Sequence, residues 1–328
     1  MAGFKHGHDT ILKTANGTQK GFALVVVIMI MLLVSFLAAQ LILSVRTQQQ
    51  IAFHARARAI GLSLAQGGVN LGIFRLIDKP LEEADAGDET LLLGYPYDAL
   101  LDNGKIDYYV VNESGKIDLN KLNKPLVNLF LDYLEIEDEQ KAIIVDSLLD
   151  WRDANDLHRL NGAEGDYYEA LDDPYQPRNG PIQDPSEFFL VKGTEELAGR
   201  FRAADVFTVH NTRGQINFNS LTPFMLDFLT EDDEEKKEAY REAQETHATM
   251  TAALARQILG DARFDACSSA LTYETGKNQF YSIVAAGRPG SGREEEGGEF
   301  SAEGPESGIS VLLQLRGDRV RYLGWQES

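Results

Sequence analysis

The feature that most limits how this chain can fold is an uninterrupted apolar stretch near its N-terminus. Residues Phe22 to Val45 include no charged side chain and are mostly apolar. A helix rises about 1.5 Å per residue, so this stretch would reach about 36 Å, enough to cross a hydrocarbon layer of about 30 Å. We therefore predict a transmembrane helix over 22–45, and we expect the function to reside in the residues that follow it.

Charge is distributed unevenly on the two sides of this stretch. Residues 1–21 carry three lysines and one aspartate, a net charge of +2, so the net charge of −20 for the whole chain leaves −22 for the rest. Short basic flanks stay on the cytoplasmic side, which predicts that the acidic body lies across the membrane. A body this acidic repels phosphate backbones, so we expect no nucleic-acid partner.

The residues just before the apolar stretch leave two interpretations open. A secretory signal has an apolar run of about 7–15 residues followed by small residues at the cleavage site. Here the run is longer, and the small residue, Gly21, precedes it. The chain is either an uncleaved signal anchor or a precursor cut on the cytoplasmic side between Gly21 and Phe22, which would leave the helix on the mature protein.

Hydrophobic periodicity predicts the elements after the apolar stretch. Apolar residues recur at helical spacing from Arg46 to about Asp78, and Lys79-Pro80 ends the pattern. Residues 118–271 have mainly helical patterns. Four segments are predicted to be strands: 106–112, 280–286, 309–316 and 319–325. A helix packed on a small antiparallel sheet, with a helical domain inserted into it, fits this order.

Two segments are unusually polar. Residues 229–247 are almost wholly polar, which predicts a solvated helix or a mobile arm. Residues 287–308 are rich in glycine and glutamate, which predicts a flexible loop.

A short repeat lies inside the helical region. Residues 117–125 (IDLNKLNKP) match 216–223 (INFNSLTP), and Asn120 and Asn219 are predicted to cap the helices that follow. We interpret the repeat as two similar helical units. Helix-hairpin-helix modules that bind DNA are the alternative, but four carboxylates in residues 134–139 would repel phosphate.

Residues 150–187 contain the densest group of oxygen ligands in the chain. Calcium takes six to eight oxygens in flexible geometry, and the glycines and prolines here create turns that can wrap an ion. The segment 153–156 resembles the opening of a calcium loop but lacks the full EF-hand pattern. A solvated loop with Asx turns is the alternative. The single cysteine, Cys267, excludes an intrachain disulfide, so another means of stabilising a long loop is needed.

Catalysis is not predicted. Glycosidases need two carboxyls at a set separation, which a sequence cannot show. The histidines lack metal-binding spacing, and Ser186 lacks a nucleophile-elbow pattern. We expect no enzyme, and a membrane-anchored hydrolase that uses the acidic loop is the alternative from another class.

Two groups of residues together resemble a known family. Lys20-Gly21-Phe22 followed by a long apolar helix resembles the leader of type IV pilins and pseudopilins, which a prepilin peptidase cuts after the glycine. The DWRDAND…NGAE…YY…NGP series in residues 150–187 resembles the general secretion pathway protein K family, the large minor pseudopilins of type II secretion systems.

The resemblance implies a fold and a function. The fold is α+β, with a pilin-like long N-terminal helix packed on a small antiparallel sheet and a large, mainly helical domain inserted. The function is that of a minor pseudopilin that initiates or caps the pseudopilus at its tip with other minor pseudopilins. Its anchor would lie in the bacterial inner membrane and its C-terminal body in the periplasm. A minor pilin of a type IV pilus is the alternative from the same class.

The resemblance also implies modifications and a metal. Cleavage would fall between Gly21 and Phe22, with N-methylation of Phe22. The fifth mature residue would be Val26 rather than the usual glutamate, and the valine avoids a cost of about 2.5–3.5 kcal/mol for a lone carboxylate in lipid. The usual glutamate is thought to pair with the N-terminal amine of a neighbouring subunit, and a subunit at the fibre tip, with none above it, can do without that pair. Calcium would bind in the inserted domain, and the ligands that we expect are Asp153, Asp156, Glu164, Asp166, Asp172 and Asp173.

These inferences divide the chain into four parts. They are a leader peptide (1–21), a transmembrane helix (22–45), a pilin-like helix and sheet (46–117 with 272–328) and an inserted helical domain (118–271).

Overall fold

The structure is a computed structural model that describes residues 19–77, 91–211, 213–246, 250–274, 280–290, 305–317 and 319–328. The chain divides into two compact units, Met1–Arg56 and Ala57–Ser328. Helix α1, Gln19–Ile77, contributes residues to both units.

The part of α1 in the first unit has the character of a membrane helix. Its most apolar 18-residue window has a mean hydropathy of 3.1, and none of that window is buried. An exposed apolar surface of this kind is unfavourable in water and favourable in hydrocarbon. The helix begins at Gln19, so both Gly21 and Phe22 lie within it, whereas residues 1–18 of the predicted leader lie outside the described residues.

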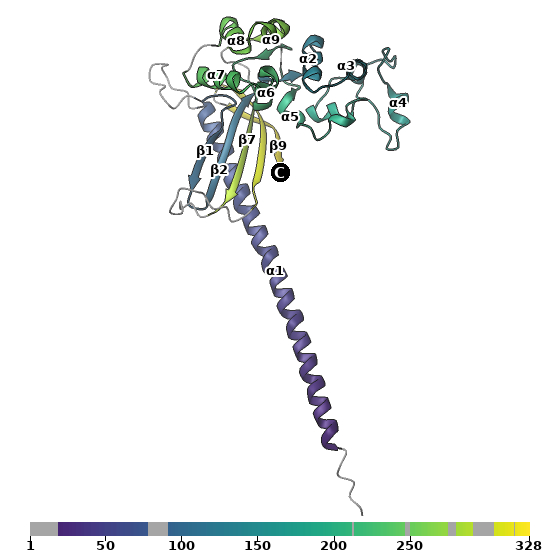
Figure 1. Cartoon of the computed structure of the whole chain (residues 1–328), viewed down its shortest axis with the longest axis vertical. Helices are drawn as coiled ribbons and strands as arrows, with labels where there is room; N and C mark the ends of the chain where they lie inside the picture. Colours follow the sequence, from purple (N-terminus) through teal and green to yellow (C-terminus); the bar gives the residue numbers. More distant parts are fainter. Residues whose placement is uncertain are drawn as a thin grey trace, which may run out of the picture. The chain divides into compact units, whose positions relative to one another are not determined.

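The second unit is built on an antiparallel sheet of five strands within the described residues (Figure 1). The strands, in sheet order, are β1 (Tyr97–Leu101), β2 (Gly104–Asn112), β7 (Phe280–Pro289), β8 (Ser307–Arg316) and β9 (Arg319–Glu327). The four predicted strands are all present. β1 was not predicted, because its sequence, YDALL, alternates poorly; it pairs with β2 across a tight turn.

The predicted loop over 287–308 is partly wrong. β7 continues to Pro289 and β8 already begins at Ser307, because Gly287 and Ser307 pair across the two strands. Residues 291–304 of that prediction lie outside the described residues.

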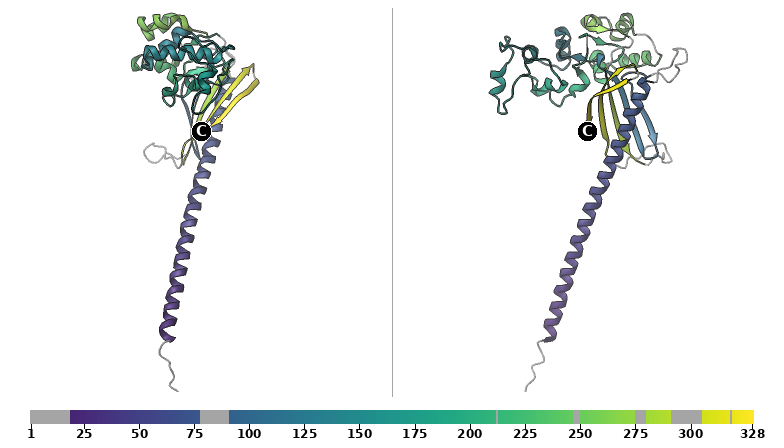
Figure 2. Two further views of the ribbon diagram at one scale, coloured as in Figure 1. Left: turned by 90° about the vertical axis from the view of Figure 1, so that its right-hand side faces the viewer. Right: turned by 180° about the vertical axis from the view of Figure 1, so that it is seen from behind.

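The last twenty residues of α1 lie on one face of this sheet (Figure 2). Glycines make the close approach possible: a Cβ added at Gly68 would lie 2.8 Å from Ala285 Cβ, and one at Gly72 would lie 3.0 Å from Ile283 Cγ2. Leu64, Ala65 and other buried side chains fill the space beside them. Glycines that reduce helix propensity by about 1 kcal/mol each therefore serve the packing of helix on sheet.

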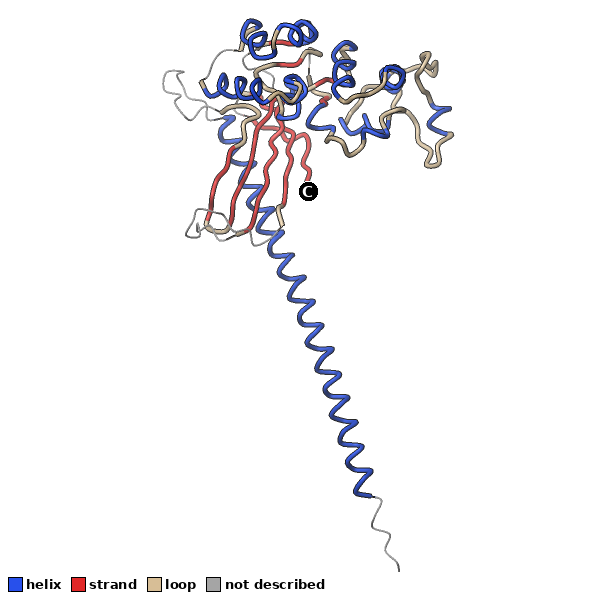
Figure 3. The backbone as a smooth tube through the Cα atoms, in the orientation of Figure 1, coloured by secondary structure: helices blue, strands red, loops and turns tan. Residues whose placement is uncertain are grey.

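The helical region leaves and rejoins the sheet at one end, because Asn112 of β2 pairs with Tyr281 of β7 (Figure 3). Its elements are η3 (Glu113–Gly115), β3 (Ile117–Asp118), α2 (Lys124–Tyr133), α3 (Asp138–Arg152), α4 (Gly165–Glu169), η4 (Pro185–Leu190), η5 (Glu195–Leu197), α5 (Ala203–Val206), β4 (Phe207–Thr208), β5 (Ile216–Asn217), α6 (Pro223–Thr230), α7 (Glu234–Glu245), α8 (Ala252–Leu259), α9 (Asp261–Cys267), η6 (Ser268–Ala270) and β6 (Leu271–Thr272).

The two regions have separate hydrophobic cores. One core draws its buried residues from Ile117 to Leu271 and is rich in phenylalanine, and the other lies between α1 and the sheet. The domain boundaries at 118 and 271 stay a prediction, which this separation supports.

The predicted helix caps Asn120 and Asn219 were both wrong. Asn120 does not cap a helix but exchanges two hydrogen bonds of 2.8 Å with the backbone of Ile182. The caps are Asn123 and Thr222, which accept from the backbone N–H groups of the first turns of α2 and α6. The repeat itself is present, because β3 and β5 each form a parallel two-residue bridge, with β4 and β6 respectively.

The polar segment 229–247 is not a mobile arm in its described part. Residues Glu234–Glu245 form helix α7, and Tyr240 is buried with its hydroxyl donating to the Phe218 carbonyl at 2.9 Å. One face of this helix packs and the other is solvated. The sequence pattern does not indicate the packed face, because most residues of this helix are charged. His247 lies outside the described residues.

Candidate functional site

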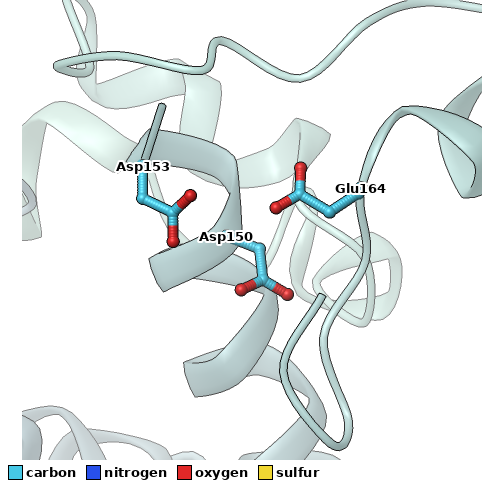
Figure 4. Close-up of side chains that lie close together, drawn as sticks. All are labelled: Asp150, Asp153 and Glu164. Carbon is cyan, nitrogen blue, oxygen red and sulfur yellow. The ribbon is translucent and has the colours of Figure 1, made fainter. Parts of the chain in front are cut away.

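Three carboxylates converge at the C-terminal end of α3. Asp150 lies in the last turn of α3 and Asp153 directly follows the helix. Glu164 lies just before α4 and points toward both (Figure 4). One oxygen from each of them lies within 4.8 Å of the others. Gly162 lets the loop close, because a Cβ there would lie 1.7 Å from Asp150 Oδ2.

The Glu164 carboxylate is buried without a hydrogen-bond partner. Its residue is 2% exposed, and neither oxygen has a partner among the described residues. Burial, followed by the charges of Asp150, Asp153 and Asp156, raises the pKa of Glu164 to about 7. A buried carboxylate beside two others is unfavourable unless a cation compensates it.

Arg159 compensates the two aspartates. Its guanidinium Nη1 donates to both, at 2.7 Å in the case of Asp153 Oδ2, and its backbone N–H donates to Asp150 Oδ2 at 3.0 Å. Asp153 Oδ1 accepts from the Asn155 side chain at 2.7 Å. Arg159 therefore engages Asp150 and Asp153, whereas Glu164 has no hydrogen-bond partner among the described residues.

Aromatic packing and a second ion pair hold the surrounding loop. Trp151 packs against the edge of Tyr168 with ring centroids 5.1 Å apart, and its indole N–H donates to Glu187 at 3.3 Å. Arg178 donates to both oxygens of Glu187. Burial acts to raise the pKa of Glu187, but hydrogen bonds from Arg178 and the Gln183 backbone lower it below its usual value. Trp151 and Tyr168 are both buried and belong to the hydrophobic core of the inserted region.

The residues chosen from the sequence divide into two groups. Asp153 and Glu164 belong to the converging group, whereas Asp156, Asp166, Asp172 and Asp173 are exposed and lie outside it. Asp156 is near enough for its charge to act on Glu164, and it accepts a long hydrogen bond from Asn179 at 3.4 Å.

Asp150 is the ligand candidate that the sequence did not single out. It is the first residue of the acidic region 150–187, but it is not among the six ligands expected from the sequence. The signal that could have identified it is the i, i+3 spacing with Asp153, which places both side chains on one side of the helix end.

The three carboxylates fit a hard divalent cation. Calcium and magnesium both prefer carboxylate oxygens, and calcium tolerates irregular geometry with added carbonyl or water ligands. Asp150, Asp153 and Glu164 would hold such an ion, and its charge would compensate Glu164.

Comparisons with known proteins agree on one family. The family model described as type II secretion system (T2SS), protein K matches residues 110–200. A putative type II secretion system protein K of Escherichia coli (strain K12) is 26% identical over 233 residues, which cover 63% of this chain and 68% of the relative. The type II secretion system protein K of Pectobacterium carotovorum subsp. carotovorum is 33% identical over 96 residues, 29% of each chain.

A solved structure is also similar to this chain. It is the GspK-GspI-GspJ complex from the type 2 secretion system of enterotoxigenic Escherichia coli. The match has a sequence identity of 17% and a TM-score of 0.47, and it covers 87% of this chain and 99% of the matched chain.

A long N-terminal helix on an antiparallel sheet, with a large helical region inserted between strands, defines a pilin-like protein. Its similarity to type II secretion system protein K, over residues 110–200 in the family model and over 233 residues in the first relative, identifies the chain as a minor pseudopilin. Its N-terminal apolar helix has the length and composition of a single-pass membrane anchor.

Proposed function

We propose that this minor pseudopilin initiates or caps the pseudopilus at its tip, together with other minor pseudopilins. Its anchor would lie in the inner membrane and its acidic body in the periplasm. The observation that carries the proposal is α1, whose exposed apolar part can associate with sibling helices while its last twenty residues are packed on the sheet. We expect no catalytic activity and no nucleic-acid partner.

A tip position suits two features of the chain. Val26 cannot pair through a carboxylate with the N-terminus of a neighbouring subunit, so the chain lacks a contact that a subunit inside the fibre would use. The inserted helical region would also be hard to accommodate between stacked subunits. Both features are tolerated where no subunit lies above.

Processing follows from the same proposal. Prepilin peptidase would cut between Gly21 and Phe22 on the cytoplasmic side, and Phe22 would then be N-methylated. The helix that remains would serve both as the membrane anchor and as the part of the subunit that enters the fibre.

Calcium is proposed as a structural ligand of the inserted region, held by Asp150, Asp153 and Glu164. The unpartnered carboxylate of Glu164 supports this assignment. The ion would join the end of α3 to the loop before α4 and would compensate the unpartnered carboxylate of Glu164.

Co-purification tests the tip assignment. The tagged full chain, extracted from its own cells in mild detergent after cross-linking, should bring down the other minor pseudopilins of a type II secretion system. A matched chain without residues 22–45 should bring down fewer of them. Recovery of type IV pilus subunits instead would favour the alternative of a minor pilin.

Chelation tests the calcium assignment. For the purified full chain in detergent, EGTA should lower the midpoint of thermal unfolding, and added calcium should restore it. An unchanged midpoint would contradict a structural calcium. Loss of a hydrolytic activity in a folded Asp153→Asn variant would instead favour the hydrolase alternative.

A further inference from the structure

Arg159 occupies the position on the two aspartates that a cation would need. Its guanidinium contacts Asp150 and Asp153 together, and its backbone N–H adds a hydrogen bond to Asp150. The Asp150 side chain is fully buried, whereas that of Arg159 is 38% exposed. Asp150 is thus enclosed in the fold, while Arg159 reaches it from the surface.

The oxygens of the site are not equivalent. Both oxygens of Asp150 accept from Arg159, and the two oxygens of Asp153 accept from Arg159 and Asn155. The two oxygens of Glu164 accept from none of the described residues. Glu164 is therefore free to bind an ion, whereas Asp150 and Asp153 already accept hydrogen bonds from Arg159 and Asn155.

A divalent ion bound by all three carboxylates would lie close to the Arg159 guanidinium. Like charges at such a distance repel strongly in a partly buried site. The ion and the guanidinium therefore cannot both hold the two aspartates. An open cleft of about 330 Å³ begins at Asp153 and Arg159 and offers space for the displaced side chain; its other lining residues are Asn120, Leu149, Arg152 and Pro181.

We propose that Arg159 competes with the divalent cation for Asp150 and Asp153 and thereby sets the calcium concentration at which the site fills. This inference rests on the proposed calcium site. With little calcium, Arg159 holds the end of α3 to its loop. At higher calcium the ion takes over this role, and the backbone N–H of Arg159 can stay on Asp150. Sites of extracellular modules fill at about 10⁻⁴–10⁻³ M calcium, the range in which such competition is useful.

The experiment is a calcium titration of the full chain in detergent by isothermal calorimetry. Arg159→Gln removes the charge, and Arg159→Lys keeps it. Arg256→Gln is the matched control, because Arg256 is similarly exposed and also joins two aspartates, Asp261 and Asp265, away from the site. We expect Arg159→Gln to bind calcium at least tenfold more tightly than the wild type, and Arg159→Lys to bind within threefold of it. Arg256→Gln should not change the affinity.

A second measurement guards against a folding defect. Without calcium, Arg159→Gln should unfold at a lower temperature than the wild type, and saturating calcium should remove most of that difference. Equal or weaker binding by a folded Arg159→Gln, while the wild type binds calcium, would overturn the competition and leave the calcium site standing. Absence of binding in the wild type and in both Arg159 variants would overturn the calcium site and the competition together.

Discussion

At the scale of single residues, Glu164 is the side chain on which the metal assignment depends. Its side chain is buried although it belongs to a loop, and it lies close to two other carboxylates. A group in that setting either contributes strain to the fold or binds something positive. Substitution of Glu164 can separate the two effects, because a neutral side chain removes the destabilising charge and also removes a ligand of the cation.

Replacing Glu164 by Gln should stabilise the chain in EGTA and remove its response to calcium. A neutral amide avoids the repulsion from Asp150 and Asp153, so we expect a gain of about 1–3 kcal/mol in the free energy of unfolding. The gain is measured by denaturant unfolding of the full chain in detergent. Asp172→Asn, in an exposed part of the same loop region, is the control and should change stability by less than about 0.5 kcal/mol. A Glu164→Gln variant that is still stabilised by calcium would contradict the assignment.

The single cysteine permits a second test at this scale. Cys267 is buried in the helical region, and its thiol contacts the Arg263 carbonyl at 3.1 Å. Burial raises the pKa of the Cys267 thiol to about 11. Since the thiolate is the reactive form, about one thiol in a thousand would be ionised at pH 8.

We therefore expect iodoacetamide to modify Cys267 at least about 100-fold more slowly in the native chain than in guanidinium chloride at pH 8. Mass spectrometry of timed samples measures both rates. The native rate should rise as the pH rises toward 11, because the thiolate becomes more populated. Similar rates in the two conditions would show that Cys267 is not buried.

The sequence predicted the composition of the site better than its geometry. It indicated an oxygen-rich region for a hard cation, and it included Asp153 and Glu164. It could not choose among the ten acidic side chains of residues 150–187, because that choice depends on how the loop folds back. Gly162 determines this fold by giving Asp150 space, and nothing in the residue pattern marks that contact.

At the scale of elements, α1 combines two different helix surfaces in one continuous helix. Up to Val45 every side is apolar and exposed, and after residue 57 a stripe of small residues faces the sheet. Periodicity was sufficient to predict the helix and the four main strands. Periodicity does not reveal the role of the glycines in α1, because that role depends on a contact with strands far away in sequence.

Replacing Gly68 by Ala tests this explanation of α1. Alanine raises helix propensity by about 1 kcal/mol. The new Cβ, however, would lie 2.8 Å from both Ala285 Cβ and Ile106 Cγ2. Overpacking of this kind costs about 1–3 kcal/mol, so the variant should lose stability overall.

The matched control is Asn70→Ala, on an exposed position of the same helix turn. It should gain a few tenths of a kcal/mol from propensity alone. Thermal unfolding of the two full-length variants, compared with the wild type, decides between the two effects. Equal stabilisation by both substitutions would contradict the role assigned to Gly68.

At the scale of the whole molecule, the chain joins an apolar helix to a strongly acidic body. The positive charge of residues 1–21 and the negative charge of the remainder would orient the chain across a membrane, with the acidic body on the side opposite the short basic flank. Similarity to the protein K family supplies the secretion context, and the apolar helix connects that context to the physical properties of this chain.

The most direct test of this account is mass spectrometry of the N-terminus of the chain isolated from its own cells. We predict a mature chain that begins at Phe22 with one added methyl group, because the helix must survive processing to act as anchor and fibre component. A Gly21→Leu variant should keep its leader, while a Gln19→Ala control should be processed normally. A native N-terminus at Met1, or one beyond Val45, would contradict the account.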